Sequence, residues 1–435
     1  MKRFIFIVSM FAIISSCKQD ADLQSASTNP ISAETVSAIS NVKSLGITND
    51  GKIDQQSKIQ AIIGSNKTLF FPKGTYLISK SLDIKNITNF KIYGEAGTIF
   101  VSPTNKIITL LGNAYNIEIS AITFKSTRVS TVNDAEGLIF IAAFGANDLM
   151  DGININKCTF TNPQSQGNGI KLVSEGTRSM VKYISVANNR FESIGRMAIE
   201  FQNHANQDVA RFKDFYIHDN YFFDIGTIQS GPAPSCVSVS GYSTNGQINN
   251  NEFYNMRMKD SPFIYYGIEN AGTIGLETNN NYFHSDTYGF TGILGSAKTK
   301  SNWTISNNVF ELTGSTTDKN KIRGIEINDA INFTITNNKI TTDGMAMMLV
   351  NCRSGNITGN TGKVKVGNAF YARAGSIKNI ITKNTFNTSL GPDNGVVLFD
   401  GSTTNSNSAT SNTLIGTDNK VGKYVNVNGA YNNYK

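Results

Sequence analysis

The chain has 435 residues, of which 39% are hydrophobic and 16% are charged, and its formal net charge is +7. That apolar fraction excludes a wholly disordered chain, and 8 prolines are too few for a collagen-like one. The length suits two or three domains, but no proline-rich or charged linker divides the interior, so one large regular unit is favoured.

The first residues have the pattern of an export signal. Lys2 and Arg3 precede an apolar run over residues 4–14, which is too short to cross a bilayer as a mature helix. The small residues before Cys17 resemble a bacterial lipobox, which implies cleavage after residue 16 and a lipid on the cysteine; an ordinary cleaved signal with a stray cysteine is the alternative. We expect residues 1–16 to be a lipoprotein signal peptide and the exported protein to be anchored to the outer membrane through Cys17. Acidic residues just after the cysteine favour the cell surface.

Residues 17–40 are rich in Ser, Thr, Ala and Asn without a sustained hydrophobic period, so a flexible tether is predicted. The folded domain is expected over residues 41–435. It should open with a strand and turn, after which Asp54 can cap a helix whose apolar residues lie between Ile59 and Ile63 and which ends at Gly64. Such a helix would cap the end of a stack of strands.

A short motif, Asn-Asn-x-Phe or a close variant, then recurs along the chain. Its second asparagine occupies positions 189, 220, 251, 281, 308, 338, 360 and 384, and Cys158 stands in the same slot 31 residues before the first. A period of this length, made of short strands and without a long helix, is typical of a β-solenoid in which stacked turns bury one core. We expect the repeated Phe and Ile to line that core, and the asparagines to hydrogen-bond between turns as structural residues.

The entry segment carries a family resemblance. An Asn-Asp-Gly turn at 49–51, the helix near Ile59 and the sequence FFPKGTY at 70–76 resemble the start of right-handed parallel β-helix proteins of the pectate lyase superfamily. The repeats extend the resemblance to about residue 420. It implies an all-β fold, a single-stranded right-handed parallel β-helix (β-solenoid) with a short N-terminal capping helix. The signatures of polygalacturonases and alginate epimerases are absent, so no specific enzyme family is matched.

The three remaining cysteines, Cys158, Cys236 and Cys352, lie far apart and form no CxxC pair, which favours buried core thiols over disulfides or a zinc site. With 3 histidines and no HxxxH, a zincin-type metal centre is not predicted. No acidic cluster like that of classical pectate lyases is seen. No cofactor is therefore predicted, although calcium remains open.

Superposing the strands after each bend predicts which residues face outward, because alternate residues of a strand point to opposite faces. One position should face inward: Ile170, Ile199, Val237, Ile268, Ile293, Ile325 and Met347. The next should face outward: Lys171, Glu200, Ser238, Glu269, Leu294, Glu326 and Met348. Two further outward columns follow: Val173, Gln202, Ser240, Ala271, Ser296, Asn328 and Val350, then Glu175, His204, Tyr242, Thr273, Lys298, Ala330 and Cys352.

This outer face allows two kinds of chemistry. Glu200 and Glu269 are two repeats apart, so their backbones should lie ~10 Å apart and their carboxyls within the range that inverting glycosidases use. A pair of exposed, inactive glutamates is the alternative. In the second scheme, β-elimination on a uronate polymer, His204, Tyr242 and Lys298 supply the base and acid while Arg196 and Arg323 neutralise the carboxylate.

The excess of positive charge favours an acidic polysaccharide over nucleic acid as the partner of an exported protein. Gln202, Tyr265, Tyr266 and Glu326 are further candidates for substrate binding on this face. We therefore expect depolymerisation of an acidic polysaccharide by a lyase, with a hydrolase using Glu200 and Glu269 as the first alternative. A non-catalytic glycan-binding or adhesive solenoid is the second.

Overall fold

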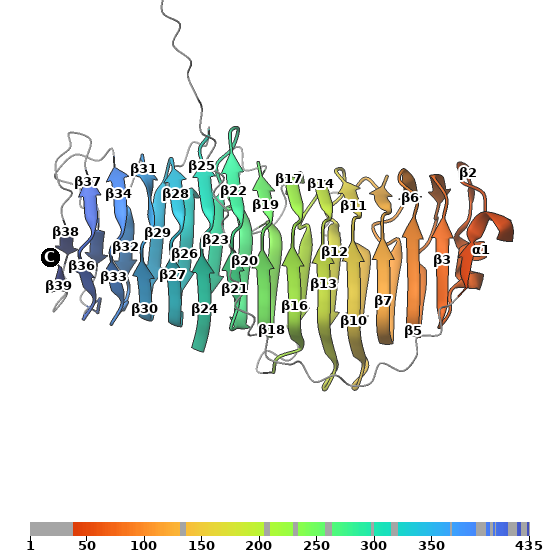
Figure 1. Cartoon of the computed structure of the whole chain (residues 1–435), viewed down its shortest axis with the longest axis horizontal. Helices are drawn as coiled ribbons and strands as arrows, with labels where there is room; N and C mark the ends of the chain where they lie inside the picture. The colour runs from red at the N-terminus through yellow and green to blue at the C-terminus, as the bar shows by residue number, and fades with distance from the viewer. Residues whose placement is uncertain are drawn as a thin grey trace, which may run out of the picture. The chain divides into compact units, whose positions relative to one another are not determined.

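The computed structural model describes residues 38–130, 136–203, 209–228, 234–256, 263–296, 300–314, 321–365, 368–388, 397–400, 403–404, 406–415, 424–427 and 433–434 (Figure 1). The predicted signal peptide, Cys17 and nearly all of the predicted tether lie outside these ranges, as do His204 and Lys298. The first strand begins at Ile39, two residues before the expected boundary.

Two parallel sheets make up the described part of the chain, one of 14 strands and one of 25. The strands of the smaller sheet are β2 (Asp50–Asp54), β4 (Gly74–Leu77), β6 (Thr98–Ser102), β8 (Thr123–Ser126), β11 (Thr159–Asn162), β14 (Arg190–Ile194), β17 (Tyr221–Ile225), β19 (Glu252–Tyr254), β22 (Tyr282–Ser285), β25 (Val309–Leu312), β28 (Lys339–Thr342), β31 (Thr361–Val364), β34 (Thr385–Thr388) and β37 (Thr413–Ile415). Each pairs in parallel with its neighbours in this order, and the end strands β2 and β37 pair on one side within the described residues.

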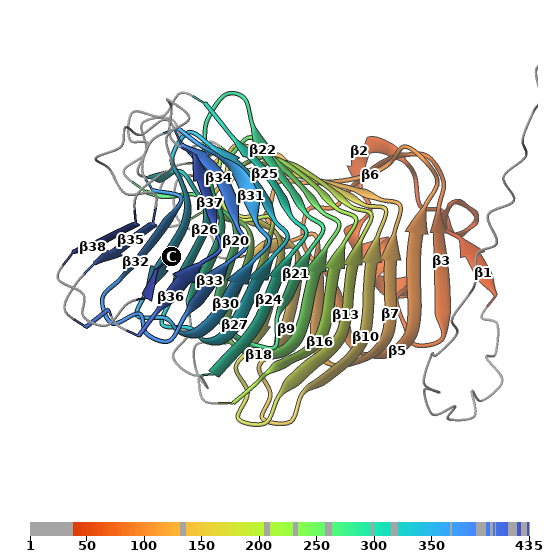
Figure 2. The same cartoon turned by 60° about the vertical axis from the view of Figure 1, so that its left-hand side comes forward.

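The larger sheet contains two rows of strands, joined where β5 (Leu82–Gly94), β7 (Ile108–Ser120) and β18 (Ser235–Asn249) run through both. The first row continues with β9 (Gly137–Ala143), β12 (Asn168–Ser174), β15 (Ile199–Asn203), β20 (Tyr266–Ile274), β23 (Thr291–Ser296), β26 (Arg323–Asn328), β29 (Met345–Val350), β32 (Phe370–Arg373), β35 (Val397–Asp400) and β38 (Tyr424–Val427). The second row has β10 (Leu149–Asn156), β13 (Met180–Ala187), β16 (Phe212–His218), β21 (Glu277–Asn279), β24 (Lys300–Ser306), β27 (Ile331–Thr336), β30 (Arg353–Thr358), β33 (Ile380–Thr382), β36 (Ser408–Thr410) and β39 (Asn433–Tyr434). Strands β1 (Ile39–Asn41) and β3 (Lys67–Phe71) begin the second row, because β3 pairs with the second part of β5. Figure 2 shows successive repeats lying side by side.

Every strand pair among the described residues is parallel, which confirms the prediction of an all-β fold with stacked parallel strands. A 3-10 helix, η1 (Val42–Leu45), and one α-helix, α1 (Gln56–Ile62), lie before the regular repeats. Asp54 accepts a hydrogen bond from the N–H of Gln56 at 3.0 Å, and Gln60 bonds the carbonyl of Asp83 on β5 at 2.9 Å. The short helix therefore packs on the first repeats, as expected (Figure 1). Within the described residues, no helix has the length and apolar character needed to span a membrane.

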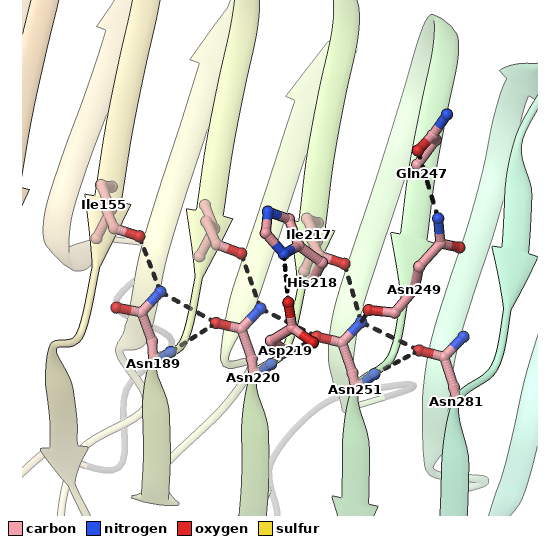
Figure 3. A network of polar contacts seen from close by, with 11 residues as sticks. Ile155, Asn189, Ile217, His218, Asp219, Asn220, Gln247, Asn249, Asn251 and Asn281 are labelled. Carbon is pink, nitrogen blue, oxygen red and sulfur yellow. Dashed lines mark hydrogen bonds and ion pairs between the residues drawn. The ribbon is translucent and has the colours of Figure 1, made fainter. Parts of the chain in front are cut away.

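The repeated asparagines form a continuous ladder inside the stack. Asn189, Asn220, Asn251 and Asn281 are almost fully buried, and each side-chain amide donates to the carbonyl oxygen of the next one at 3.0 Å (Figure 3). The same oxygen also accepts the backbone N–H of the preceding asparagine. The ladder continues to Asn412. Because every amide is used in this way, the asparagines have the structural role predicted for them.

Aromatic rings fill the core beside this ladder. The phenylalanines of the repeats stack from Phe124 to Phe310, with ring centroids 4.5–5.3 Å apart. Cys158, Cys236 and Cys352 are free thiols buried in the same core, and burial raises the pKa of each, so the prediction of core cysteines is confirmed. Apolar stacking and the amide ladder together hold consecutive repeats in one register, which fixes the outward columns described next.

Candidate functional site on the first row

The predicted register of the first row is confirmed. The inward residues Ile170, Ile199, Val237, Ile268, Ile293, Ile325 and Met347 pair in one continuous line. The residues that follow them pair in the same way, and so do those of the second outward column. Lys171, Glu200, Glu269 and Glu326 therefore lie on neighbouring strands of one face.

Glu200 is held as an anion by two cations. Its Oε2 accepts from Lys171 Nζ at 2.6 Å, from Arg196 Nη1 at 2.5 Å and from Asn168 Nδ2 at 2.8 Å. The side chains of Lys171 and Glu200 are only 2% and 6% exposed. Burial alone would raise the pKa of Glu200, but Lys171 and Arg196 outweigh it and lower the pKa below the usual value. Burial disfavours the charged form of Lys171 as well and therefore lowers its pKa, although the charge of Glu200 acts in the opposite direction.

Glu269 has a different environment. Its Oε2 accepts hydrogen bonds from the hydroxyls of Ser238 at 2.8 Å and Ser235 at 3.3 Å, and it forms no ion pair within the described residues. Desolvation raises the pKa of Glu269, the two serines offset this in part, and the charge of Glu200 raises it further. The two carboxyls thus have pKa values displaced in opposite directions.

Glu326 completes the row. It forms an ion pair with Arg323 and accepts a hydrogen bond from Asn328 at 3.2 Å. Burial, together with the charges of Glu326 and Glu269, raises the pKa of Tyr266, so its phenol stays neutral. This phenol and the guanidinium of Arg323 lie beside the carboxyl row.

The three glutamates are evenly spaced. Glu269 is separated from Glu200 by the strand that carries Ser238, and from Glu326 by the strand that carries Leu294. Since neighbouring strands lie ~4.8 Å apart, the backbone of Glu269 is ~10 Å from each of the other two. The carboxyl whose pKa is raised therefore stands between Glu200, whose pKa is lowered, and Glu326, which pairs with Arg323.

Some expected site residues do not belong to this face. Tyr265 is completely buried in the core, so its assignment as a substrate-binding residue was wrong. The chain bends before each first-row strand, and two consecutive residues face inward at that bend. This shifts the alternation of the residues before it, so Tyr265 faces inward. The third outward column was also wrong. Thr273 pairs with Ser243 instead of Tyr242, because the register shifts within β18, and Ala330 and Cys352 are buried. Tyr242 is partly exposed but is not aligned with the column.

The other predicted residues are accounted for as follows. Arg196, Arg323, Tyr266 and Glu326 gather around the carboxyl row, whereas Gln202 is engaged by Lys171 Nζ at 2.6 Å and donates to Glu175 at 2.9 Å. His204 and Lys298, as stated, lie outside the described residues. Sequence reasoning assigned no role to Asn168, Lys171, Ser235 and Ser238. The signal that could have found Asn168 and Ser235 is their shared position three residues before the outward column.

Within the described residues, no group of three or more His, Cys, Asp or Glu side chains is arranged to hold a metal ion. The described part of the site consists of carboxyls, hydroxyls, amides and cations. Such a set can transfer protons, position a hydroxylated substrate and neutralise negative charge.

The environment of Glu269 predicts a pH-dependent stability. Because the folded protein raises the pKa of this carboxyl, its contribution is fully favourable below the unfolded pKa and is lost as the pH rises through the folded pKa. We expect the Glu269→Gln variant to be more stable than wild type at pH 8, by the thermal midpoint, with the two converging near pH 4. If Glu269→Gln were instead less stable than wild type at pH 8, and this deficit disappeared at pH 4, Glu269 would be ionised and stabilised in the folded protein.

Comparisons with known proteins agree with this fold. Residues 39–221, which are 183 of the 435, match the family described as rhamnogalacturonase A/epimerase, pectate lyase-like. No curated protein sequence matches the chain.

Three solved structures are similar. The A-module of the mannuronan C-5 epimerase AlgE4 from Azotobacter vinelandii has a TM-score of 0.55 at 14% identity, over 92% of this chain and 100% of that one. The Dettilon tailspike protein has a TM-score of 0.53 at 13% identity, over 89% and 68%. DFA-IIIase from Arthrobacter chlorophenolicus has a TM-score of 0.52 at 12% identity, over 89% and 96%. At these identities the likeness concerns the fold.

Proposed function

We propose that this protein acts on a polysaccharide and hydrolyses a glycosidic bond at the carboxyl row of the first row of strands. The observation that carries the proposal is the opposite displacement of two carboxyl pKa values on strands two apart, since acid and base roles are set by such environments. The pectate lyase-like match over residues 39–221 and the mannuronan epimerase among similar structures support a carbohydrate substrate.

In this proposal Glu269 is the general acid. Desolvation raises the pKa of Glu269 and so favours its protonated form, and it donates that proton to the leaving glycosidic oxygen as the bond to the anomeric carbon breaks. Ser238 and Ser235 hold one carboxyl oxygen in place, which leaves the other oxygen for the substrate. A carboxyl in this role must lose its proton in every turnover and regain it from water afterwards.

Glu200 is the proposed base. Three donors engage its Oε2, whereas among the described residues Oε1 receives a single long hydrogen bond, from Arg196 Nη2 at 3.4 Å. Oε1 can therefore accept a proton from a water molecule that attacks the anomeric carbon on the face opposite the leaving group. With backbones ~10 Å apart, the two carboxyls leave room for that water, which corresponds to inversion at the anomeric carbon.

The charge around the row supports an acidic substrate. Lys171 and Arg196 pair with Glu200 and Arg323 pairs with Glu326, while the raised pKa of Glu269 disfavours a negative charge on the third carboxyl. The surplus of cations favours a sugar that carries a carboxylate. β-Elimination on the same polymer stays a prediction, because two of the three residues assigned to it, His204 and Lys298, lie outside the described residues.

Digestion of a panel of acidic and neutral polysaccharides separates the hypotheses. Hydrolysis produces new reducing ends without the ultraviolet absorbance of a double bond conjugated to a carboxylate, and NMR of the first product gives the inverted anomer. Appearance of that absorbance would overturn hydrolysis in favour of elimination. Retention on a glycan without any product would favour the non-catalytic alternative.

Two further features belong to the same proposal. We infer that the repeats wind as a right-handed parallel β-helix, with their substrate-binding face on the first row. We also infer that the protein is exported and tethered through a lipid on Cys17 and residues 17–40. Loss of membrane association in a Cys17→Ala variant would support the tether, and unchanged association would reject it.

A further inference from the structure

A pocket lies on the second row of strands, beyond the bend that separates this row from the carboxyl row. Its volume is about 440 Å³, and it is lined by Ser185, Tyr216, His218, Gln247, Asn249 and Asn250. Strand β18 passes through both places: Ser238 belongs to the carboxyl row, and Gln247 belongs to this pocket after the bend at Gly241, whose φ is +93°. The pocket is therefore separate from the proposed active site.

One exposed tyrosine is among the residues that line this pocket. Tyr216 is 38% exposed, and it stands between Ser185 on the preceding strand and Gln247 on the following one. Because Ser185 is small, the ring of Tyr216 has no large side chain beside it on that strand. No hydrogen bond or ring contact involves the Tyr216 side chain within the described residues. The phenylalanine rings of the core, in contrast, stack on one another.

Most of the groups around the ring are amides and hydroxyls, which carry no charge. Gln247 and Asn249 belong to the same strand, and Asn249 Nδ2 donates one long hydrogen bond of 3.4 Å to Gln247 Oε1 (Figure 3). Asn249 Oδ1 also accepts the backbone N–H of Asn279 at 3.0 Å, so the remaining capacity for a ligand is the amide N–H groups of Gln247 and one N–H of Asn249. The imidazole of His218 is hydrogen-bonded to Asp219 at 2.7 Å (Figure 3). Among the described residues, no Lys, Arg, Asp or Glu lines the pocket. Amides and hydroxyls both donate and accept, which is what the hydroxyls of a neutral sugar require.

A backbone feature beside the pocket points the same way. Tyr183, two residues before Ser185, has φ +52° and is 51% exposed. The matching positions on the strands before and after are Gly152 and Asp214, which tolerate this conformation better than an aromatic residue does. The left-handed conformation costs a residue such as Tyr roughly 1–2 kcal/mol. The Tyr183 ring also contacts Lys182, whose Nζ lies 5.1 Å from the ring centroid, so this exposed ring adds an aromatic surface near the pocket without lining it.

Another pocket, on the smaller sheet, has a different lining. It measures about 560 Å³, and its lining includes Glu252, Asp286 and Glu311. There the hydroxyls of Tyr254 and Tyr282 are already bonded to carboxylates, at 2.7 and 2.5 Å. Of these two pockets in the described residues, the one at Tyr216 combines an unengaged ring with amides and hydroxyls.

We propose that the pocket at Tyr216 binds uncharged pyranose units of a neutral glycan, which stack on the Tyr216 ring and hydrogen-bond to Ser185, Gln247 and Asn249. Its volume lies within the range of pockets that hold small ligands. The site is independent of the proposed hydrolysis, since binding here needs neither Glu200 nor Glu269. It would hold a second glycan, or an uncharged stretch of the same polymer, on a different face of the stack.

The test measures binding of the full chain to immobilised β-glucans, mannans, galactans and xylans. Wild type should bind at least one of them, and Tyr216→Ala should weaken that binding about tenfold, the order expected for the loss of one aromatic stacking contact. Tyr115→Ala is the matched control, because Tyr115 is 36% exposed on β7, three strands away in the same sheet, and should bind as wild type does. Failure of wild type to bind any of the four glycans would overturn the proposal.

A second variant guards against loss of folding. Ser185→Arg fills the pocket while Tyr216 stays in place, and it should weaken binding as Tyr216→Ala does, with an unchanged circular dichroism spectrum. Binding that survives either variant overturns the site. Glu269→Gln should bind these neutral glycans like wild type even if it has lost turnover, so failure here and failure of the proposed hydrolysis give different results.

Discussion

Replacing Glu269 by Gln is expected to lower kcat on the polysaccharide by roughly 10²- to 10⁴-fold, the usual loss when a general acid is removed. The amide keeps the size of the side chain and its contact with Ser238, but it has no acidic proton to give. The measurement is the initial rate of reducing-end formation at saturating substrate. A matched control is Glu277→Gln on β21, an exposed glutamate in the same sheet, which should leave kcat unchanged.

The role of the acid can be separated from a structural role by changing the leaving group. An aryl glycoside whose phenol is already acidic needs little protonation, so Glu269→Gln should lose far less activity on it than on the polymer. If the loss were equal on both substrates, Glu269 would act by positioning instead of by proton donation. In the pH profile of wild-type kcat, activity should fall on the alkaline side with an apparent pKa above the ordinary pKa of a glutamate, because desolvation raises the pKa of Glu269.

Replacing Asn251 by Ala is expected to cost roughly 2–6 kcal/mol in the free energy of unfolding. The substitution deprives the buried N–H of Asn220 of its acceptor and the carbonyl of Ile217 of a donor, and each unsatisfied group costs about 1–3 kcal/mol. It also interrupts the ladder to Asn281 (Figure 3). Denaturant unfolding followed by circular dichroism measures the change.

The neighbouring asparagine provides the control. Asn250 is exposed with φ +58°, a conformation that glycine adopts freely, so Asn250→Gly should change the unfolding free energy by no more than about 0.5 kcal/mol. Equal effects of the two substitutions would mean that the ladder contributes nothing specific to stability.

The spacing of the asparagines made most of the fold predictable. A fixed period places equivalent residues of successive repeats side by side, and parallel pairing then dictates the register, so Lys171, Glu200, Glu269 and Glu326 could be placed on one face from sequence alone. The prediction failed where the chain leaves regular alternation. Two consecutive residues face inward at the bend before each first-row strand, which buries Tyr265, and the shift within β18 displaces Tyr242.

The chemistry of the row was less predictable than its position. Glu200 and Glu269 occupy the same column, yet one is surrounded by Lys171 and Arg196 and the other by two serines. Those partners come from neighbouring strands and from the residues just before them, so their contacts depend on side-chain packing that a sequence pattern does not specify. The pocket at Tyr216 was missed for the same reason, because it depends on the small size of Ser185 next to an exposed ring.

The central claim is that the carboxyl row hydrolyses glycosidic bonds with Glu269 as the acid. Mass spectrometry of the products from an acidic polysaccharide, digested by wild type and by Glu269→Gln, tests it most directly. The account predicts that wild-type products together carry the added mass of one water for each bond cleaved, and that the variant gives almost none. Products lacking that water and ending in an unsaturated uronate, or equal product from the variant, would contradict it.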